Sequence, residues 1–150
     1  MKKLLLLIML LVSTIGSAYA FVDKYTLDRS DLPEEAQQML TEYFPKAKVG
    51  MIKVDRHLLK KTDYDVRLVN GTTIEFSNKG KWTMVDCKKR EVPSGLVKKN
   101  IRNHVAKNYP DTIIVRIKKK ASGYEIRLSD GVELEYNLLG SFKKVSMTDD

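Results

Sequence analysis

The sequence contains one pattern twice. YDVRLVNGTTIEF at residues 64–76 returns sixty positions later as YEIRLSDGVELEY at residues 124–136. Self-similarity at a fixed spacing is typical of a duplicated supersecondary unit. We therefore predict two repeats, at about residues 30–87 and 91–147, within one domain over residues 21–150. Identical residues stand at these positions of the two copies: Tyr64/Tyr124, Arg67/Arg127, Leu68/Leu128, Gly71/Gly131 and Glu75/Glu135.

Each repeat is predicted to begin with a helix. Asp31 and Glu34 have the spacing of a capping box, and Pro33 suits the first turn, where its missing N–H costs nothing. Phe44-Pro45 and Tyr109-Pro110 end the helices, because the residue before a proline is disfavoured in the α region. Apolar residues spaced by three and four form the buried stripes: Leu32, Ala36, Met39, Leu40 and Tyr43 in the first helix, and Val97, Ile101 and Val105 in the second.

The same offset also relates Leu32-Pro33 to Val92-Pro93 upstream of the two helices. If these pairs are equivalent, the second helix is five residues longer than the first. The loop after its first strand is then five residues shorter, so that the period of sixty is kept.

Four strands are predicted to follow each helix, beginning with Val49–Val54 and Ile113–Lys118. In the repeated segments apolar and polar residues alternate, which indicates strands with one buried face. A three-residue turn ending at Gly71 keeps this alternation, because it pairs Val66 with Ile74 and Tyr64 with Phe76. Gly71 then takes the left-handed position of a type I turn with a G1 bulge, and Gly131 repeats it.

A single four-stranded unit would bury little surface and leave an open sheet edge. Two units side by side can share one sheet, with both helices on the same face. The predicted fold is therefore α+β, with tandem α-β4 units, an antiparallel sheet of about eight strands and helices on one face. A pair of separately packed lobes is the alternative.

The first twenty residues have the composition of a signal peptide. Lys2-Lys3 precede an apolar run from Leu4 to Val12, and Ala18-Tyr19-Ala20 supplies small residues at the cleavage positions. An uncleaved anchor is the alternative, but the apolar run is short for a membrane span and no stop-transfer segment follows. We expect a chain cleaved near Ala20 that begins at Phe21, is periplasmic or secreted, and does not span a membrane.

Cys87 is the only cysteine, so the chain cannot form an intrachain disulfide. Lys88, Lys89 and Arg90 beside it would favour a reactive thiolate. The preferred interpretation is that Cys87 fills an apolar position, because its counterpart in the second repeat is Met147.

The order of these motifs resembles the PepSY-like family, also called beta-lactamase-inhibitor-like. The resemblance rests on the signal peptide, the Leu/Val-Pro helix with its aromatic-Pro end, and Y-[DE]-[VI]-R-L-x-[ND]-G followed by x-x-G-x-[WF], all but the signal peptide occurring twice. It covers residues 30–147 and implies a periplasmic or secreted protein similar in architecture to beta-lactamase inhibitor proteins. It implies no catalytic residues, and architecture alone does not establish inhibition.

The sequence offers no set of residues that predicts catalysis, a cofactor or a metal. His57 and His104 are the only histidines, and neither has a partner at ligand spacing. The formal net charge is +8, but the lysines are dispersed and the hairpin aromatics are predicted to point into the core. No stacking platform for nucleic acid is therefore expected. We predict neither an enzyme nor a nucleic-acid-binding protein.

The polar sides of the strands carry the predicted binding surface. The register places Asp65 opposite Glu75 and Glu125 opposite Glu135, with Arg67 and Arg127 diagonal to the second acid of each pair. The main interpretation of these charges is a solvated ladder of salt bridges. We predict that this face docks an exported or envelope protein, through ten residues: Asp65, Arg67, Thr73, Glu75, Arg116, Lys118, Glu125, Arg127, Glu133 and Glu135.

Three other functions remain open. The acid pairs would suit an envelope ligand sensor or a calcium-binding module. An enzyme of unfamiliar type would need a concave pocket with coupled titratable groups. A protein without a dedicated partner surface would instead dimerise through its edge strands.

Overall fold

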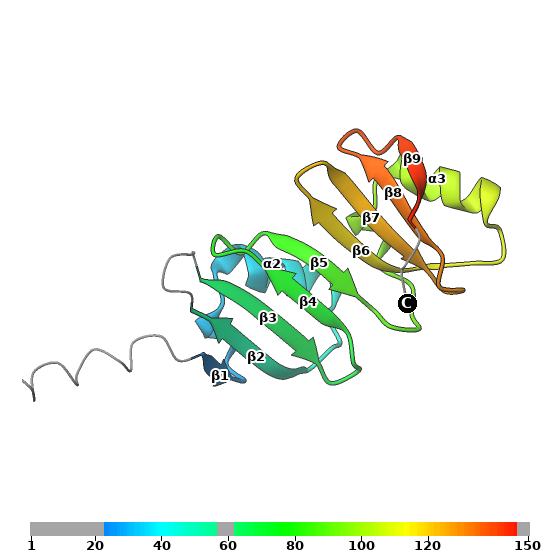
Figure 1. Ribbon diagram of the computed structural model, residues 1–150. Coiled ribbons are helices and arrows are strands. Elements are labelled where there is room, and N and C mark those ends of the chain that lie inside the picture. Colours follow the sequence, from blue (N-terminus) through cyan, green and yellow to red (C-terminus); the bar gives the residue numbers. More distant parts are fainter. Residues whose placement is uncertain (1–22, 57–61, 147–150) are drawn as a thin grey trace, which may run out of the picture.

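The computed structural model describes residues 23–56 and 62–146. The expected signal peptide, His57 and Met147 lie outside the described residues. The described residues form one antiparallel sheet of nine strands, in which every strand lies beside its neighbours in sequence (Figure 1). The predicted α+β fold is confirmed. The additional strand is β1 (Lys24–Thr26), which pairs with the outer edge of β2.

Two units of similar composition follow each other along this sheet. The first unit comprises η2 (Arg29–Asp31), α2 (Glu34–Tyr43), β2 (Val49–Asp55), β3 (Asp63–Leu68), β4 (Thr73–Phe76) and β5 (Trp82–Asp86). The second comprises η3 (Ser94–Leu96), α3 (Lys99–Asn108), β6 (Ile114–Lys120), β7 (Gly123–Leu128), β8 (Glu133–Asn137) and β9 (Phe142–Ser146). Strands β5 and β6 pair directly, with Val85 opposite Ile117. The units therefore share one sheet, and separately packed lobes are not found.

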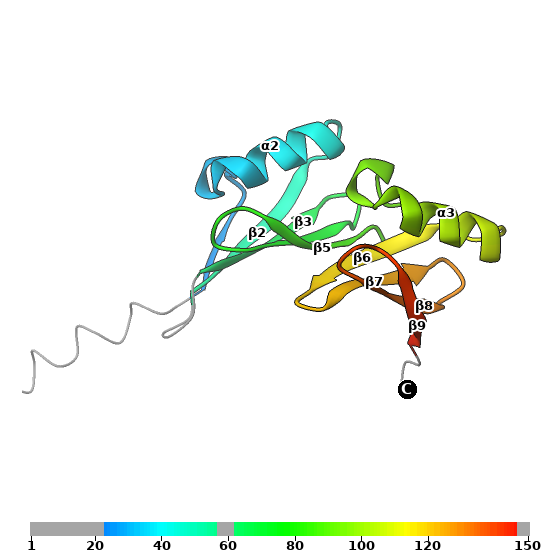
Figure 2. The same cartoon turned by 90° about the horizontal axis from the view of Figure 1, so that it is seen from above.

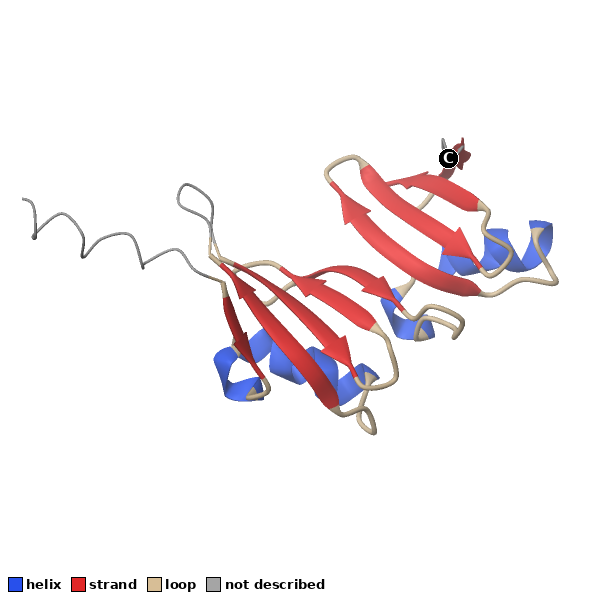
Figure 3. Ribbon diagram, turned by 60° about the horizontal axis from the view of Figure 1, so that its bottom comes forward, coloured by secondary structure: helices blue, strands red, loops and turns tan. Residues whose placement is uncertain are grey.

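Both helices lie on the same face of the sheet, as Figures 2 and 3 show from two directions. The apolar stripe of each helix packs against the apolar side of the strands and forms a single core cluster. Because the helices cover only this side, the opposite side of the sheet is left without a covering layer. Fully buried members of the core include Ala36 and Leu40 of α2, Ile101 of α3, and Val66, Ile74, Ile126 and Leu134 of the strands.

The predicted hairpin register is confirmed. Val66 lies opposite Ile74 and Tyr64 opposite Phe76, and the Leu68 amide donates to the carbonyl of Thr72 at 2.8 Å. Gly71 has a φ of 89° and Gly131 a φ of 93°. A Cβ at either glycine would meet no atom within 4 Å. Glycine is thus favoured here by the backbone angle of the turn, not by crowding.

Two expectations about the helices were wrong. The first is the capping box: Pro33 occupies the N-cap of α2 without a side-chain cap, and Asp31 lies in η2, where it pairs with Lys24 at 2.6 Å. The second is the longer second helix, since α2 and α3 both have 10 residues.

The equivalence of Leu32-Pro33 with Val92-Pro93 was the cause of the second error. In the structure Leu32 and Val97 both close a short 3-10 helix and precede the longer helix. The helices and first strands of the two units are therefore related by an offset of 65 residues, whereas the later strands keep the offset of sixty. The longer β2–β3 connection of the first unit absorbs the difference. The Leu32-Pro33 and Val92-Pro93 pairs are similar in sequence but do not occupy equivalent positions in the two units.

Candidate binding face

The side of the sheet opposite the helices carries two rows of side chains that run across the strands. We call these two rows the open face. The strand register defines the first row as Lys53, Asp65, Glu75, Met84, Lys118, Glu125, Glu135 and Lys144. The second row is Met51, Arg67, Thr73, Asp86, Arg116, Arg127, Glu133 and Ser146. All ten residues predicted for the binding surface therefore lie in two adjacent rows.

In the second unit the charges of this face neutralise one another. The Arg116 Nη2 donates to the Oε1 of Glu125 at 2.7 Å and to the Oε1 of Glu133 at 3.0 Å. Arg127 donates from Nε to the same Glu133 oxygen at 2.7 Å, and its Nη2 lies 2.6 Å from that oxygen in an ion pair. Lys120 forms an ion pair with Glu125 and lies 3.9 Å from Glu135. The predicted salt-bridged ladder is found in this unit.

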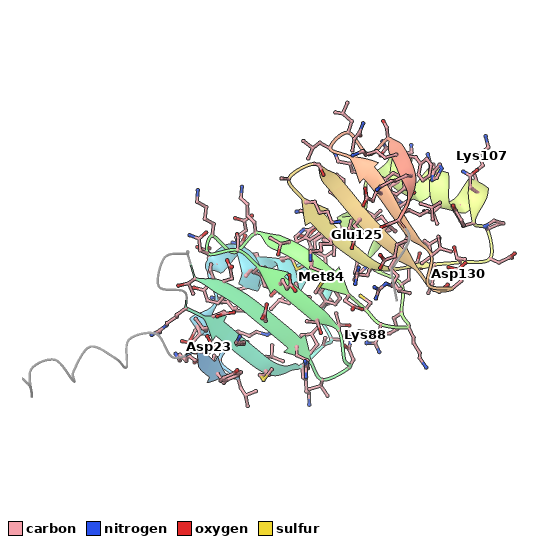
Figure 4. All side chains as sticks on the ribbon, in the orientation of Figure 1. Asp23, Met84, Lys88, Lys107, Glu125 and Asp130 are labelled. Atoms are coloured by element: carbon pink, nitrogen blue, oxygen red, sulfur yellow. The ribbon has the colours of Figure 1, made fainter. Side chains whose placement is uncertain are left out.

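Two of these carboxylates are buried although they lie on the uncovered side of the sheet. Glu125 is 8% and Glu133 is 5% exposed, because the surrounding cationic side chains cover them (Figure 4 labels Glu125). Burial by itself would raise the pKa of Glu125. Hydrogen bonding to Lys120 and the charges of Lys120 and Arg116 reverse this and hold the pKa below its ordinary value. The network therefore keeps Glu125 ionised.

The acid pair of the first unit, Asp65 and Glu75, is not neutralised in this way by the described residues. Asp65 lies opposite Glu75 as predicted, and neither forms an ion pair within 4.0 Å among residues 23–56 and 62–146. Lys53, the nearest cation in the row, pairs with Asp23 at 3.0 Å and with Asp55 at 3.2 Å. Burial on the sheet raises the pKa of both Asp65 and Glu75, and the charge of Asp65 adds to the effect on Glu75.

Arg67 and Arg127 lie diagonal to Glu75 and Glu135, as predicted. Arg127 bonds to Glu133, directly opposite, and not to Glu135 on the diagonal. Arg67 is exposed and has no acid within ion-pair distance in the described part of the chain. The position opposite Arg67 is Thr73, whereas the position opposite Arg127 is Glu133. A threonine in place of a glutamate thus removes the partner that the first unit would need.

The missing cations also have a sequence explanation. Under the corrected offset of 65 residues, Arg116 and Lys120 correspond to Met51 and Asp55. Lys144 corresponds to Met84 at the offset of sixty. Lys120, Lys144 and Met84 were not among the predicted surface residues, because they lie at positions where the two repeats differ. The positions at which the repeats differ therefore indicate which unit has cations beside its acids.

A hollow of about 290 Å³ lies beside the first acid pair. Among the described residues, no group of three His, Cys, Asp or Glu side chains is placed to hold a metal ion. A second hollow, of about 530 Å³, lies between the end of α2 and the β3–β4 turn, and is lined mainly by apolar groups. The lining of the first hollow comprises Asp63, Asp65, Glu75, Phe76, Ser77 and Thr83.

The contacts of Cys87 and His104 indicate structural roles for both side chains. Cys87 is 2% exposed, and burial raises the pKa of its thiol, so the apolar interpretation holds and the reactive thiolate is not supported. His104 Nδ1 lies 2.8 Å from the hydroxyl of Tyr136, and its ring stacks on Phe142 at 4.6 Å. Phe142 was expected in the core, but it is 42% exposed on the edge strand β9.

Comparison with known proteins places the chain in a family. The family model described as "Putative beta-lactamase-inhibitor-like, PepSY-like" matches residues 62–144, which is more than half of the chain. The chain belongs to the PepSY-like family. No curated protein matches it significantly. No helix within the described residues has the length and apolar character needed to cross a membrane.

Three solved structures of Bacteroides proteins are similar to this PepSY-like chain. A "putative periplasmic protein of unknown function" from Bacteroides vulgatus is 36% identical, with a TM-score of 0.80, and 84% of this chain and 100% of that chain are covered. A "putative calcium-regulated periplasmic protein" from Bacteroides thetaiotaomicron is 32% identical, with a TM-score of 0.78 and coverage of 83% and 97%. A second "putative periplasmic protein" from Bacteroides vulgatus is 34% identical, with a TM-score of 0.77 and coverage of 85% and 99%.

Proposed function

We propose that this protein is an exported, non-enzymatic binding module that docks another envelope protein through its open face. The observation that carries the proposal is the pair of charged rows on a nine-stranded sheet whose helices lie on the other side. A wide polar surface of this kind suits recognition by complementary charge and shape. The relatives described as periplasmic support an exported location.

The expected partner is an exported protein. The family description likens these chains to beta-lactamase inhibitors, which supports a hydrolase of the envelope as one class of partner. The protein itself contributes no reaction in this proposal. Its affinity would come from the arrangement of charges along the rows and from the apolar side chains between them.

Envelope capture with two variants tests the docking face. Arg67 is exposed and forms no ion pair with the described residues, so Arg67→Glu should weaken partner capture while changing the free energy of unfolding little. Arg102→Glu on α3 makes the same charge change on an exposed helix position and should leave capture intact. The bait is the chain from Phe21, which contains every described helix and strand. If the two variants retain the same proteins as the native chain, the open face is not the docking surface.

Export with removal of the leader is the second part of the proposal. The mass of the protein recovered from the periplasmic fraction should correspond to a chain beginning at Phe21. A recovered chain that retains Met1–Ala20 would contradict cleavage.

A calcium-dependent role is a second candidate function. It is favoured by the relative described as calcium-regulated and by the acid pair Asp65–Glu75, which forms no ion pair within 4.0 Å among the described residues. Calcium prefers six to eight oxygen ligands, so further ligands would have to come from water or from a partner. A calcium titration followed by Tm tests it: a rise in Tm that Asp65→Asn removes supports calcium binding, and an unchanged Tm contradicts it.

A further inference from the structure

In the second unit the acid pair lies beside lysine ammonium groups, and the first unit has no lysine at the two equivalent positions. Glu125 and Glu135 lie opposite each other on β7 and β8. Lys120 pairs with Glu125 and lies 3.9 Å from Glu135, which Lys144 also approaches to 3.9 Å. The same strand geometry thus holds the ammonium group of a lysine beside two carboxylates.

The counterpart in the first unit is Asp65 and Glu75, in the same register on β3 and β4. The positions of the two lysines are occupied by Asp55 and Met84. Met84 brings no charge, and Asp55 is paired with Lys53, which also pairs with Asp23, so that neither position supplies a cation to Asp65 and Glu75. Two adjacent ionised carboxylates on a sheet repel each other unless a cation lies nearby. The first unit therefore presents a negative surface at the place where the second unit is neutral.

We propose that this surface binds a lysine- or arginine-bearing segment of the partner protein, with one cationic side chain between Asp65 and Glu75. The inference rests on the proposed function and names the chemistry that the partner must bring. A Lys or Arg from outside would take the place that Lys120 holds in the second unit. The carboxylates would then gain charge-assisted hydrogen bonds that residues 23–56 and 62–146 do not provide.

The side chains around the acid pair define the partner segment further. Met84 lies directly beside Glu75 in the row, and Met51 lies in the neighbouring row beside Arg67 (Figure 4 labels Met84). Tyr25 of β1 continues the first row past Lys53 and is 60% exposed. Lysine and arginine carry apolar stems below their charged ends, and methionine packs readily against such stems. The surface therefore suits a cationic segment with apolar residues interspersed.

A metal ion fits this position less well than a cationic side chain. Calcium is bound by six to eight oxygen atoms, and the acid pair supplies two carboxylates from strands that run side by side. No third acid among the described residues joins them in a metal-binding group. An ammonium or guanidinium group needs fewer ligands, and the second unit accommodates an ammonium in this way.

Titration of the chain from Phe21 with a defined peptide tests the inference. The probe is acetyl-Lys-Val-Lys-Val-Lys-amide, followed by the shifts of backbone amide signals in NMR spectra. We expect shifts at Asp65, Glu75 and Met84, and none at Glu125 or Glu135. The double variant Asp65→Asn/Glu75→Gln should weaken binding about tenfold, a loss of about 1.4 kcal/mol. Shifts confined to the second unit would overturn the proposal.

A matched control separates a specific site from general attraction. Glu34→Gln/Glu42→Gln removes the same two charges from exposed positions of α2 on the helix side. This variant should bind the peptide as the native chain does. Equal weakening by both variants would mean non-specific attraction and would overturn the proposal. So would calcium at 1 mM displacing the peptide with its own shifts at Asp65 and Glu75, a result that assigns the pair to the metal.

Envelope capture distinguishes the failure of this inference from that of the proposed function. A partner retained equally by the native chain and by Asp65→Asn/Glu75→Gln, but lost by Arg67→Glu, would keep the docking face and overturn the cationic contact. A partner lost from both variants supports both statements. Failure to retain any envelope protein would contradict the docking function, and the peptide titration would then decide the chemistry of the acid pair by itself.

Discussion

The first and second units pair their strands in the same register, yet their carboxylates lie in different surroundings. Glu125 in the second unit is buried beneath Arg116 and Lys120, and its pKa is held low by them. Asp65 and Glu75 in the first unit form no ion pair among the described residues, although Lys53 lies opposite Asp65, and burial raises their pKa values. The duplication preserved the hairpins and changed the charges that stand on them. Glu125 and Glu133 of the second unit are neutralised by cations of the chain itself, whereas Asp65 and Glu75 of the first unit form no ion pair among the described residues.

This difference has a cost that points to function. Adjacent carboxylates without ion-pair partners on a sheet lower stability by a small amount. Surfaces used for binding commonly carry such unfavourable groups, since removing them costs function. The second unit shows that this sheet geometry can accept the neutralising residues.

The largest expected difference between the units concerns Gly123. It has a φ of 147°, and a Cβ there would lie 1.9 Å from the carbonyl oxygen of Tyr136. Its counterpart in the first unit is Asp63, with an ordinary backbone. We expect Gly123→Asp to lower the free energy of unfolding by about 3 kcal/mol or more. The reciprocal change Asp63→Gly should cost less than about 1 kcal/mol. Urea unfolding measures both, and equal losses would contradict the asymmetry.

The next effect concerns the buried network. Arg116→Met gives the second unit the residue of the first and leaves Glu125 and Glu133 without their shared partner. We expect a loss of about 2 kcal/mol in the free energy of unfolding, somewhat less than for a fully buried pair. The reciprocal Met51→Arg places a cation near exposed groups and should change stability by less than about 0.5 kcal/mol. A loss below 0.5 kcal/mol for Arg116→Met as well would show that the network is not stabilising.

The acid pair Asp65–Glu75 and the single carboxyl of Glu125 should respond to pH in opposite directions. A carboxyl whose folded pKa is raised binds more protons in the folded state, so stability falls as the pH rises from its ordinary pKa through the raised one. Asp65→Asn/Glu75→Gln should therefore raise Tm at pH 7 and lose this advantage at pH 4. Glu125 has a lowered pKa and contributes stability that is lost as the pH falls through that pKa. Glu125→Gln should therefore lower Tm at pH 7 and have a smaller effect in acid.

Thermal unfolding at a series of pH values checks both changes on the same chain. Parallel curves for the two variants would contradict the difference between the units. The effect on the first pair should be modest, because both side chains are partly solvated and salt screens their repulsion.

The smallest expected effect on stability belongs to a substitution at position 84, which tests the difference between the two units most directly. Met84→Lys gives the first unit the counterpart of Lys144, beside Glu75. We expect weaker binding of the cationic peptide, with a change of less than about 0.5 kcal/mol in the free energy of unfolding, because position 84 lies between Glu75 and Lys118 and the new charge is attracted by one and repelled by the other. Met84→Leu controls for the loss of methionine and should change neither charge nor peptide affinity. Unchanged peptide binding in Met84→Lys would separate the acid pair from the proposed contact.

The local structure of the hairpins followed from the sequence. Alternation placed Val66 and Ile74 on the buried side, and Gly71 determined where the chain turned. A shift of one residue would have exposed the whole apolar set, so the register had one acceptable solution. For the same reason all ten predicted surface residues lie on one face. The helix offset was wrong, because a Leu-Pro and Val-Pro likeness was taken for an equivalence that the 3-10 helices do not support.

The pairing of charges was decided only by the tertiary structure. Arg116 on β6 reaches Glu133 on β8 across an intervening strand, and Lys53 turns away from Asp65 toward Asp23. Such contacts depend on side-chain direction and on which strands become neighbours, and neither has a local sequence signal. The addition of β1 and the β5–β6 junction are likewise pairings between distant segments. The sequence determined the strands, turns and faces because these follow from near neighbours, whereas the fold decided which of the duplicated acids would find a cation.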